Sequence, residues 1–188
     1  MDINILNKIA VKMVADSKGI LAIDESHGTC KKRFDALNIN VTEENRRSYR
    51  DMLISANSLS DYISGAILFD ETIRQKTSDG STFPDYLNKV GIIPGIKVDA
   101  GAKPFSCHPG EKITEGLDGL TERMKEYSAL GAKFAKWRAV ISIGESMPSN
   151  ACMLANSHAL ARYASICQEI NIVPIVEPEV LMDGSHNI

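Results

Sequence analysis

Two basic side chains, Lys136 and Arg138, interrupt an apolar stretch of the chain at residues 131–140 (GAKFAKWRAV). Because side chains alternate across a β-strand, the two cations are predicted to share one face and Trp137 to occupy the other. A cation on a buried strand is costly unless an anion meets it. The pattern therefore indicates either internal salt bridges or a site for a multiply charged anionic partner.

Charged residues also lie at or near the ends of three other apolar segments. Asp24 closes GILAID, Lys97 and Asp99 close GIIPGIKVD, and Glu177 and Glu179 lie in IVPIVEPE. If these segments are parallel strands, cations and acids converge at one edge, where their opposed charges shift pKa values and provide both an acid and a base near neutral pH. We favour an active site for acid–base chemistry on an anionic substrate over a ring of structural ion pairs.

The segments that position these residues alternate between strand and helix patterns. Strands are predicted for the apolar runs at residues 19–24, 62–69, 91–99, 131–140 and 172–179. Helices are predicted at 1–14, 42–56, 83–90, 117–127 and 149–170, and a loop at 100–114. Apolar strands that alternate with helices are typical of a parallel sheet covered on both faces.

Two α/β architectures fit this pattern: an open, doubly wound sheet of five strands, or the first five strands of a (β/α)8 TIM barrel. The predicted strands begin about 38 residues apart, so eight of them need roughly 300 residues, which lies within the usual barrel range. The first strand is not followed by a glycine-rich phosphate fingerprint, since Gly28 stands alone in ESHGTC. Charged residues at the carboxyl ends of strands also favour the barrel.

Composition narrows the class of protein further. The chain has 188 residues, 44% hydrophobic and 24% charged, with a net charge of −3, which gives no case for binding nucleic acid or an anionic membrane surface. No apolar run approaches the roughly 20 residues of a membrane span. Without a secretory signal or CxxC spacing, the cysteines are predicted to be free thiols of a cytoplasmic protein, with no metal site: Cys30, Cys107, Cys152 and Cys167.

A series of motifs runs nearly from end to end of the chain: GILAIDESHGT, TEENRRSYRDML, SGAILFDETIRQKTSDG, GIIPGIKVD, GLDGLTERMKEY, GAKFAKWR, LARYASICQ and IVPIVEPEVLMDG. In this order they resemble class I, or Schiff-base, fructose-bisphosphate aldolase. The resemblance implies a (β/α)8 barrel, a homotetramer, and reversible cleavage of fructose 1,6-bisphosphate into the triose phosphates dihydroxyacetone phosphate and glyceraldehyde 3-phosphate. It implies no cofactor or metal, because a lysine imine is the electron sink.

The resemblance also implies roles for individual residues. Asp24 matches the family acid beside the C4 hydroxyl, and Lys136 matches the lysine that assists carbinolamine chemistry. Glu177 matches the general acid/base that removes the carbinolamine hydroxyl. Substrate-binding roles are implied for Ser26, Arg33, Arg46, Lys97, Arg138 and Glu179.

The Schiff-base lysine of the family lies on the sixth strand, in a Leu-Leu-Lys-Pro-Asn type of motif that does not occur here. We therefore expect residues 1–188 to form a single aldolase barrel domain that is incomplete at its C-terminus and inactive alone. The alternative is a catalytically inactive protein, built on an aldolase half-barrel, that binds sugar phosphates or a protein partner.

Overall fold

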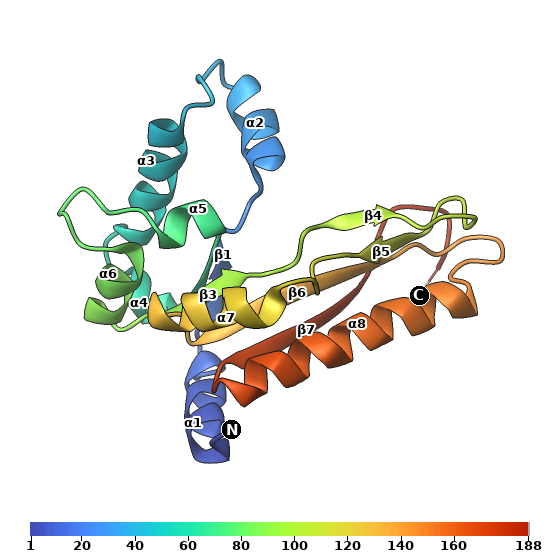
Figure 1. The fold of residues 1–188 in the computed structure, drawn as a ribbon. Coiled ribbons are helices and arrows are strands. Elements are labelled where there is room, and N and C mark those ends of the chain that lie inside the picture. Colours follow the sequence, from blue (N-terminus) through green and yellow to red (C-terminus); the bar gives the residue numbers. More distant parts are fainter. Residues whose placement is uncertain (188) are drawn as a thin grey trace.

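A computed structural model describes residues 1–187 as an α/β fold with two sheets (Figure 1). The larger sheet contains β1 (Gly19–Ala22), β2 (Ile63–Leu68), β3 (Ile93–Lys97), β6 (Phe134–Ile141) and β7 (Val173–Val180). The smaller sheet is a hairpin of β4 (Ala102–Pro104) and β5 (Lys112–Thr114).

The order of the strands in the larger sheet decides between the two predicted architectures. The strands pair in parallel in the order β1-β2-β3-β6-β7, so each lies beside the strand that precedes it along the chain in this sheet. A doubly wound sheet reverses its strand order at a switch point, whereas the strands of a barrel follow one another. The prediction of a partial barrel is confirmed, and the doubly wound alternative is excluded.

Helices connect the strands: α1 (Ile3–Met13), α2 (His27–Asp35), α3 (Glu43–Ile54), α4 (Leu59–Tyr62), α5 (Asp70–Ile73), α6 (Phe83–Lys89), α7 (Leu120–Ala129) and α8 (Asn150–Glu169). The five predicted helices are confirmed, although Leu117 precedes α7 rather than lying within it. Thr42 and Ser149 cap α3 and α8 by accepting a hydrogen bond from a backbone amide of the first turn. The short helices α4 and α5, and the charged α2, were not predicted from the sequence.

Residues 100–114 were predicted as a loop, and this prediction is wrong because they contain the β4–β5 hairpin. Strands of three residues are too short to show a period in the sequence. Asn156 of α8 holds the hairpin by accepting a hydrogen bond from the amide of Thr114 (3.2 Å). The Thr114 hydroxyl in turn donates to the carbonyl of Arg138 (2.7 Å), which fixes the hairpin beside β6.

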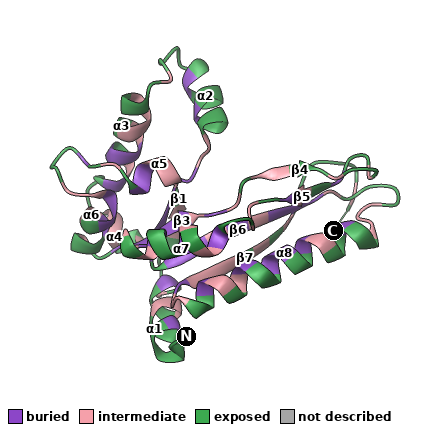
Figure 2. Ribbon diagram, in the orientation of Figure 1, coloured by how far each residue is buried: buried purple, intermediate pink, exposed green. Residues whose placement is uncertain are grey.

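The main hydrophobic core lies between the larger sheet and its covering helices, where Figure 2 shows buried residues on the strands and on the sheet-facing sides of the helices. Trp137 is fully buried there, with its ring centre 5.6 Å from that of Tyr163 on α8. Lys136 and Arg138 are only partly buried. The predicted alternation of these three side chains across β6 is therefore confirmed.

A second, smaller apolar cluster lies on the other face of the sheet, around Phe134 and Met13. The Phe134 ring covers two glycines: a Cβ atom would lie 2.2 Å from the ring at Gly95 and 2.9 Å at Gly65. These positions therefore need glycine for close approach. Phe134 and Lys136 share a face of β6, so this apolar cluster lies on the same face of the sheet as the lysine.

The outer strands β1 and β7 each pair on one side only within residues 1–187. Val176 and Val180 of β7 are each 48% exposed. Unpaired edges and exposed apolar side chains favour association between chains. We expect the 188-residue chain, expressed alone, to self-associate in sedimentation velocity experiments. A compact monomer with a cooperative thermal transition would contradict this prediction.

The cysteines are free thiols, as predicted, and only Cys107 is exposed. Burial raises the pKa of the Cys167 thiol to about 12, so this thiol stays protonated and unreactive at neutral pH. None of the helices in the described part of the chain is both long and apolar enough to cross a membrane.

Candidate active site

Lys136 lies between two carboxylates that come from the two outermost strands of the sheet. Its Nζ atom lies 3.4 Å from Asp24 Oδ2, just after β1, and 3.5 Å from Glu177 Oε2 on β7. The Lys136 and Asp24 side chains are 14% and 11% exposed. Since β1 and β7 are the outermost of the five strands, the sheet must curve strongly to bring both to one lysine.

The charged residues were predicted at the carboxyl ends of their strands, and for three of them this is wrong. Lys97 is the last residue of β3, and its Cα atom pairs with that of Lys136. Lys136, however, is near the start of β6, while Arg138 of β6 and Glu177 of β7 pair with each other in the middle of their strands. The pairing of β6 with β7 continues beyond these residues, as far as Ile141 of β6 and Val180 of β7.

Arg138 and Glu179 form a second charged pair on the same face, further along β6 and β7. Arg138 Nη2 donates to Glu179 Oε1 at 2.8 Å, and Nε donates to Oε2. These bonds hold the pKa of the Glu179 carboxyl below its usual range. The Arg138 side chain is 41% exposed, so an anion that approaches it competes with Glu179.

Lys97 is held by Asp99, whose side chain is 3% exposed and whose Oδ1 lies 3.7 Å from Lys97 Nζ. Asp99 also accepts a hydrogen bond from the backbone amide of Gly101 (3.0 Å). Burial raises the pKa of the Asp99 carboxyl, although Lys97 acts in the opposite direction. The pair keeps a second cation on the strand beside Lys136.

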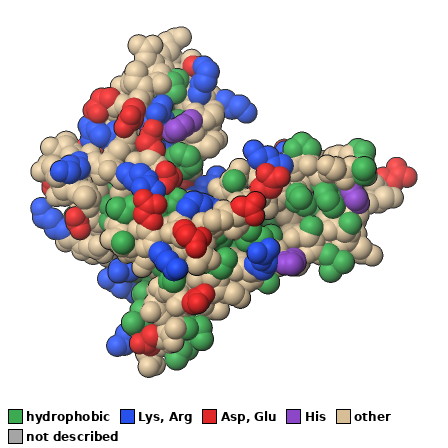
Figure 3. All heavy atoms as spheres, viewed as in Figure 1, with side chains coloured by type: hydrophobic (Ala, Val, Ile, Leu, Met, Phe, Trp, Pro, Cys, Tyr) green, Lys and Arg blue, Asp and Glu red, His purple; other side chains and the backbone are tan. Residues whose placement is uncertain are grey.

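Ser26 and Arg33 lie on the segment that follows Asp24. Ser26 is the N-cap of α2 and accepts a hydrogen bond from the Thr29 amide at 3.4 Å. The Arg33 side chain is 54% exposed and pairs with Glu25, while its Nη1 donates to the Tyr49 hydroxyl at 3.0 Å. Figure 3 shows charged side chains at the rim of a hollow between the α2–α3 region and the β4–β5 hairpin.

The guanidinium of Arg46 is paired with a carboxylate of the same chain. Its Nε and Nη2 atoms donate to the two carboxylate oxygens of Glu71, at 2.8 and 2.6 Å, and its side chain is 11% exposed. In the described residues, no hydrogen bond or ion pair joins Ser26, Arg33 or Arg46 to Lys136. The predicted site residues therefore form a central group around Lys136 and an outer group on α2 and α3.

Arg50, which was not among the predicted site residues, is completely buried. Its Nε atom donates to the carbonyl of Ile23 (3.1 Å) and its Nη2 atom to the carbonyl of Glu25 (2.6 Å). A signal was available, because Arg46 and Arg50 are four residues apart and share one face of the helix with the buried Ile54. An arginine on that face needs internal acceptors.

Glu71 joins Arg46 to Arg50, whose Nη1 atom lies 3.5 Å from Glu71 Oε1. The hydrogen bonds from Arg46 hold the pKa of the Glu71 carboxyl below its ordinary value of 4.5. The unfolded chain then binds this proton more readily than the folded one, so the free energy of unfolding falls as the pH drops below about 4.5.

We expect Glu71→Gln to lower stability near neutral pH by about 1–3 kcal/mol, since charged hydrogen bonds are lost, and to flatten the decline in acid. Urea unfolding at a fixed protein concentration, repeated from neutral to acidic pH, measures both effects. The exposed Glu122→Gln on α7 is the matched control and is expected to behave like the parent. An unchanged acid decline in Glu71→Gln would contradict the prediction.

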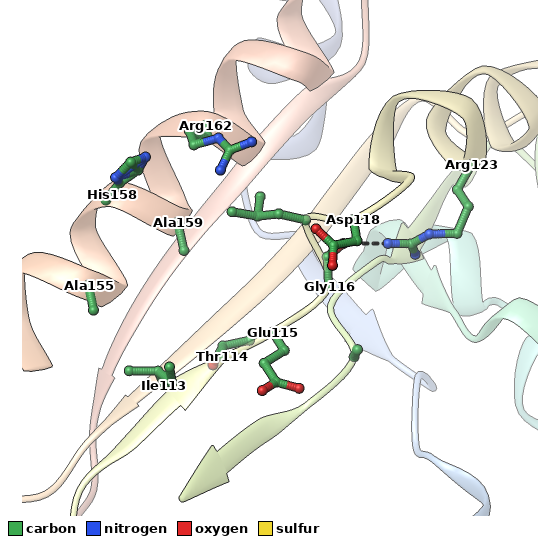
Figure 4. A pocket seen from close by; sticks show the side chains of 12 residues that line it. Ile113, Thr114, Glu115, Gly116, Asp118, Arg123, Ala155, His158, Ala159 and Arg162 are labelled. Atoms are coloured by element: carbon green, nitrogen blue, oxygen red, sulfur yellow. Dashed lines mark hydrogen bonds between the residues drawn. The ribbon is translucent and has the colours of Figure 1, made fainter. Parts of the chain in front are cut away.

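A cavity of about 750 Å³ lies between β5, α7 and α8 (Figure 4). His158 and Arg162 extend from α8 on one side, with Glu115, Asp118 and Arg123 on the other. Its lining includes none of the residues predicted for catalysis or substrate binding. The candidate chemistry therefore lies at the Lys136 group rather than in this cavity.

Comparisons with known proteins show which family the chain resembles. The family described as "Fructose-bisphosphate aldolase class-I" matches residues 5–188. The chain is 63% identical over its full length to "Probable fructose-bisphosphate aldolase class 1" of Xanthomonas axonopodis pv. citri, covering 56% of that protein. It is also 55% identical to "Fructose-bisphosphate aldolase 1" of Toxoplasma gondii, in a match that covers 95% of this chain and 50% of that protein.

The chain is also similar to a solved structure. Fructose-bisphosphate aldolase from Plasmodium falciparum, in a ternary complex with TRAP and a small-molecule inhibitor, superposes with a TM-score of 0.94 at 51% identity. The match covers 97% of this chain and 53% of that one. The chain thus spans about half the length of the relatives it matches.

Proposed function

The chain belongs to the class I fructose-bisphosphate aldolase family, and we propose that it supplies the acid–base groups of a site that cleaves fructose 1,6-bisphosphate reversibly into dihydroxyacetone phosphate and glyceraldehyde 3-phosphate. The observation that carries this proposal is Lys136 held between Asp24 and Glu177, at 3.4 and 3.5 Å. The imine-forming lysine is proposed to lie on a sixth strand, outside residues 1–188.

Glu177 is proposed as the general acid/base of imine formation. Its Oε2 atom is buried and accepts no hydrogen bond from residues 1–187. This oxygen is available to give a proton to the carbinolamine hydroxyl, which leaves as water while the nitrogen lone pair forms the imine. Lys136, 3.5 Å away, stabilises the charge that the carboxylate then carries.

Asp24 is proposed to take the proton of the C4 hydroxyl. As that proton leaves, the C4 oxygen forms the aldehyde carbonyl, the C3–C4 bond breaks, and its electron pair moves to the protonated imine. Glyceraldehyde 3-phosphate is released, and the enamine of dihydroxyacetone phosphate remains on the imine lysine. The contact with Lys136 Nζ, at 3.4 Å from Asp24 Oδ2, supports this role because it restricts the position of the carboxylate.

The two phosphates of the substrate need cations that a ligand can reach. The side chains of Lys97, Arg33 and Arg138 are 22%, 54% and 41% exposed. We propose that these three bind phosphate or the adjacent hydroxyls, with Ser26 contributing from the start of α2 and Glu179 aligning Arg138. Arg46 is included on the family resemblance alone, because its guanidinium is already bound by Glu71.

A completed hybrid tests the proposal: residues 1–188 followed by the part of the Xanthomonas axonopodis relative that lies beyond the match. We expect this hybrid to cleave fructose 1,6-bisphosphate and to be trapped covalently when borohydride is added with dihydroxyacetone phosphate. EDTA is expected to have no effect, because the imine is the electron sink. The 188-residue chain alone is expected to do neither. A hybrid that binds the bisphosphate without cleavage or trapping would favour the non-catalytic alternative.

We also propose a homotetramer and a cytoplasmic location, as the family resemblance implies. One curated relative, from Arabidopsis thaliana, is named cytosolic. The outer helix α8 exposes two apolar side chains, Leu154 (71%) and Met153 (41%), which supports a subunit contact on this face. The sedimentation coefficient of the completed hybrid measures the oligomeric state.

A further inference from the structure

We propose that Arg50 positions Asp24 for catalysis, by fixing the backbone on both sides of it. Arg50 is 0% exposed, and its guanidinium donates to the carbonyls of Ile23 (3.1 Å) and Glu25 (2.6 Å), the two residues that flank Asp24. The Asp24 carboxylate then lies 3.4 Å from Lys136. This inference rests on the role of Asp24 in the proposed function.

The segment around Asp24 needs this support because it has left the sheet. Residues 23–26 carry no regular secondary structure. The Ile23 amide still donates to the carbonyl of Ile67 on β2 (3.1 Å), which is the last ladder bond of this strand. Beyond it, Arg50 supplies the partners that buried carbonyls require.

The other contacts of the guanidinium keep it in one orientation. Its Nη1 atom faces Glu71 at 3.5 Å, its Nη2 atom lies 3.6 Å from Cys30 Sγ, and its carbon lies 5.6 Å from the centre of the Phe69 ring. A guanidinium presents several donors in a rigid, planar fork, whereas a lysine ammonium is a single point on a flexible stem. Arg50→Lys therefore keeps the charge but loses the simultaneous hold on two carbonyls.

The test is a double-mutant cycle in the completed hybrid, read as single-turnover cleavage of fructose 1,6-bisphosphate. Arg50→Lys is expected to lower the rate by about 10²-fold, as for a misplacement of about 1 Å. In an Asp24→Asn background the same substitution is expected to lower it less than about threefold, because non-additivity marks residues that act as one unit. The matched control is Arg47→Lys on the same helix, because Arg47 pairs with Glu44. This control variant is expected to cleave the substrate at the parental rate.

Thermal unfolding distinguishes a positioning role from a purely structural one. Arg50→Lys is expected to lower the stability equally in the parental and Asp24→Asn backgrounds, whereas its effect on the rate is expected to differ between them. An equal loss of rate in both backgrounds, or a parental rate in Arg50→Lys, would overturn the inference. If Arg50→Lys does not fold, Arg50→Gln enters the same cycle with the same expectations. A parental rate in Asp24→Asn would contradict the proposed role of Asp24 itself, and that variant alone reveals it.

Discussion

Glu177→Gln in the completed hybrid is expected to slow Schiff-base formation by about 10²–10⁴-fold, the usual contribution of general acid–base catalysis. The amide keeps the shape of the side chain but can neither give nor take the proton that expels the carbinolamine hydroxyl. The rate of borohydride trapping with dihydroxyacetone phosphate measures this step directly.

The matched control for this prediction is Glu169→Gln, at the exposed end of α8. It removes the same charge from a place where the side chain contacts no predicted site residue. We expect parental trapping rates from it. Trapping at the parental rate in Glu177→Gln would instead make Glu177 a structural acid, and would remove it from the proposed mechanism.

Lys136→Met is expected to lower kcat by about 10²–10³-fold, as found when a preorganised electrostatic group is removed from an active site. Methionine keeps much of the length and apolar stem of lysine. It leaves Asp24 and Glu177 facing one another without the cation that lies 3.4 and 3.5 Å from them. Steady-state cleavage of fructose 1,6-bisphosphate by the completed hybrid gives kcat and KM.

The same substitution on the neighbouring strand is the matched comparison, because the Cα atom of Lys97 pairs with that of Lys136. If Lys97 only holds a phosphate, Lys97→Met is expected to raise KM more than it lowers kcat. Identical changes in both parameters for the two variants would mean that Lys136 acts only as a binding cation, contrary to its proposed role.

The sequence by itself determined the strands of the larger sheet, five of the helices and the faces of the strands. Strand and helix periods are local properties of a few consecutive residues, so the apolar runs placed all five strands of the larger sheet and the five predicted helices. The same alternation placed Trp137 in the core, with Lys136 and Arg138 on the opposite face. The order of motifs along the chain was sufficient to indicate the family, which the comparisons bear out.

Only the tertiary structure decided which charges meet. Asp24 and Lys136 are 112 residues apart, and their contact depends on how far the whole sheet curves between β1 and β7. Arg138 could have faced any of several acids, and the long pairing of β6 with β7 brings it to Glu179. The sequence also did not indicate which carbonyls accept hydrogen bonds from Arg50, namely those of Ile23 and Glu25. Such contacts depend on the twist that accumulates across the whole sheet and on how the helices pack against it. A local sequence pattern predicts neither of these.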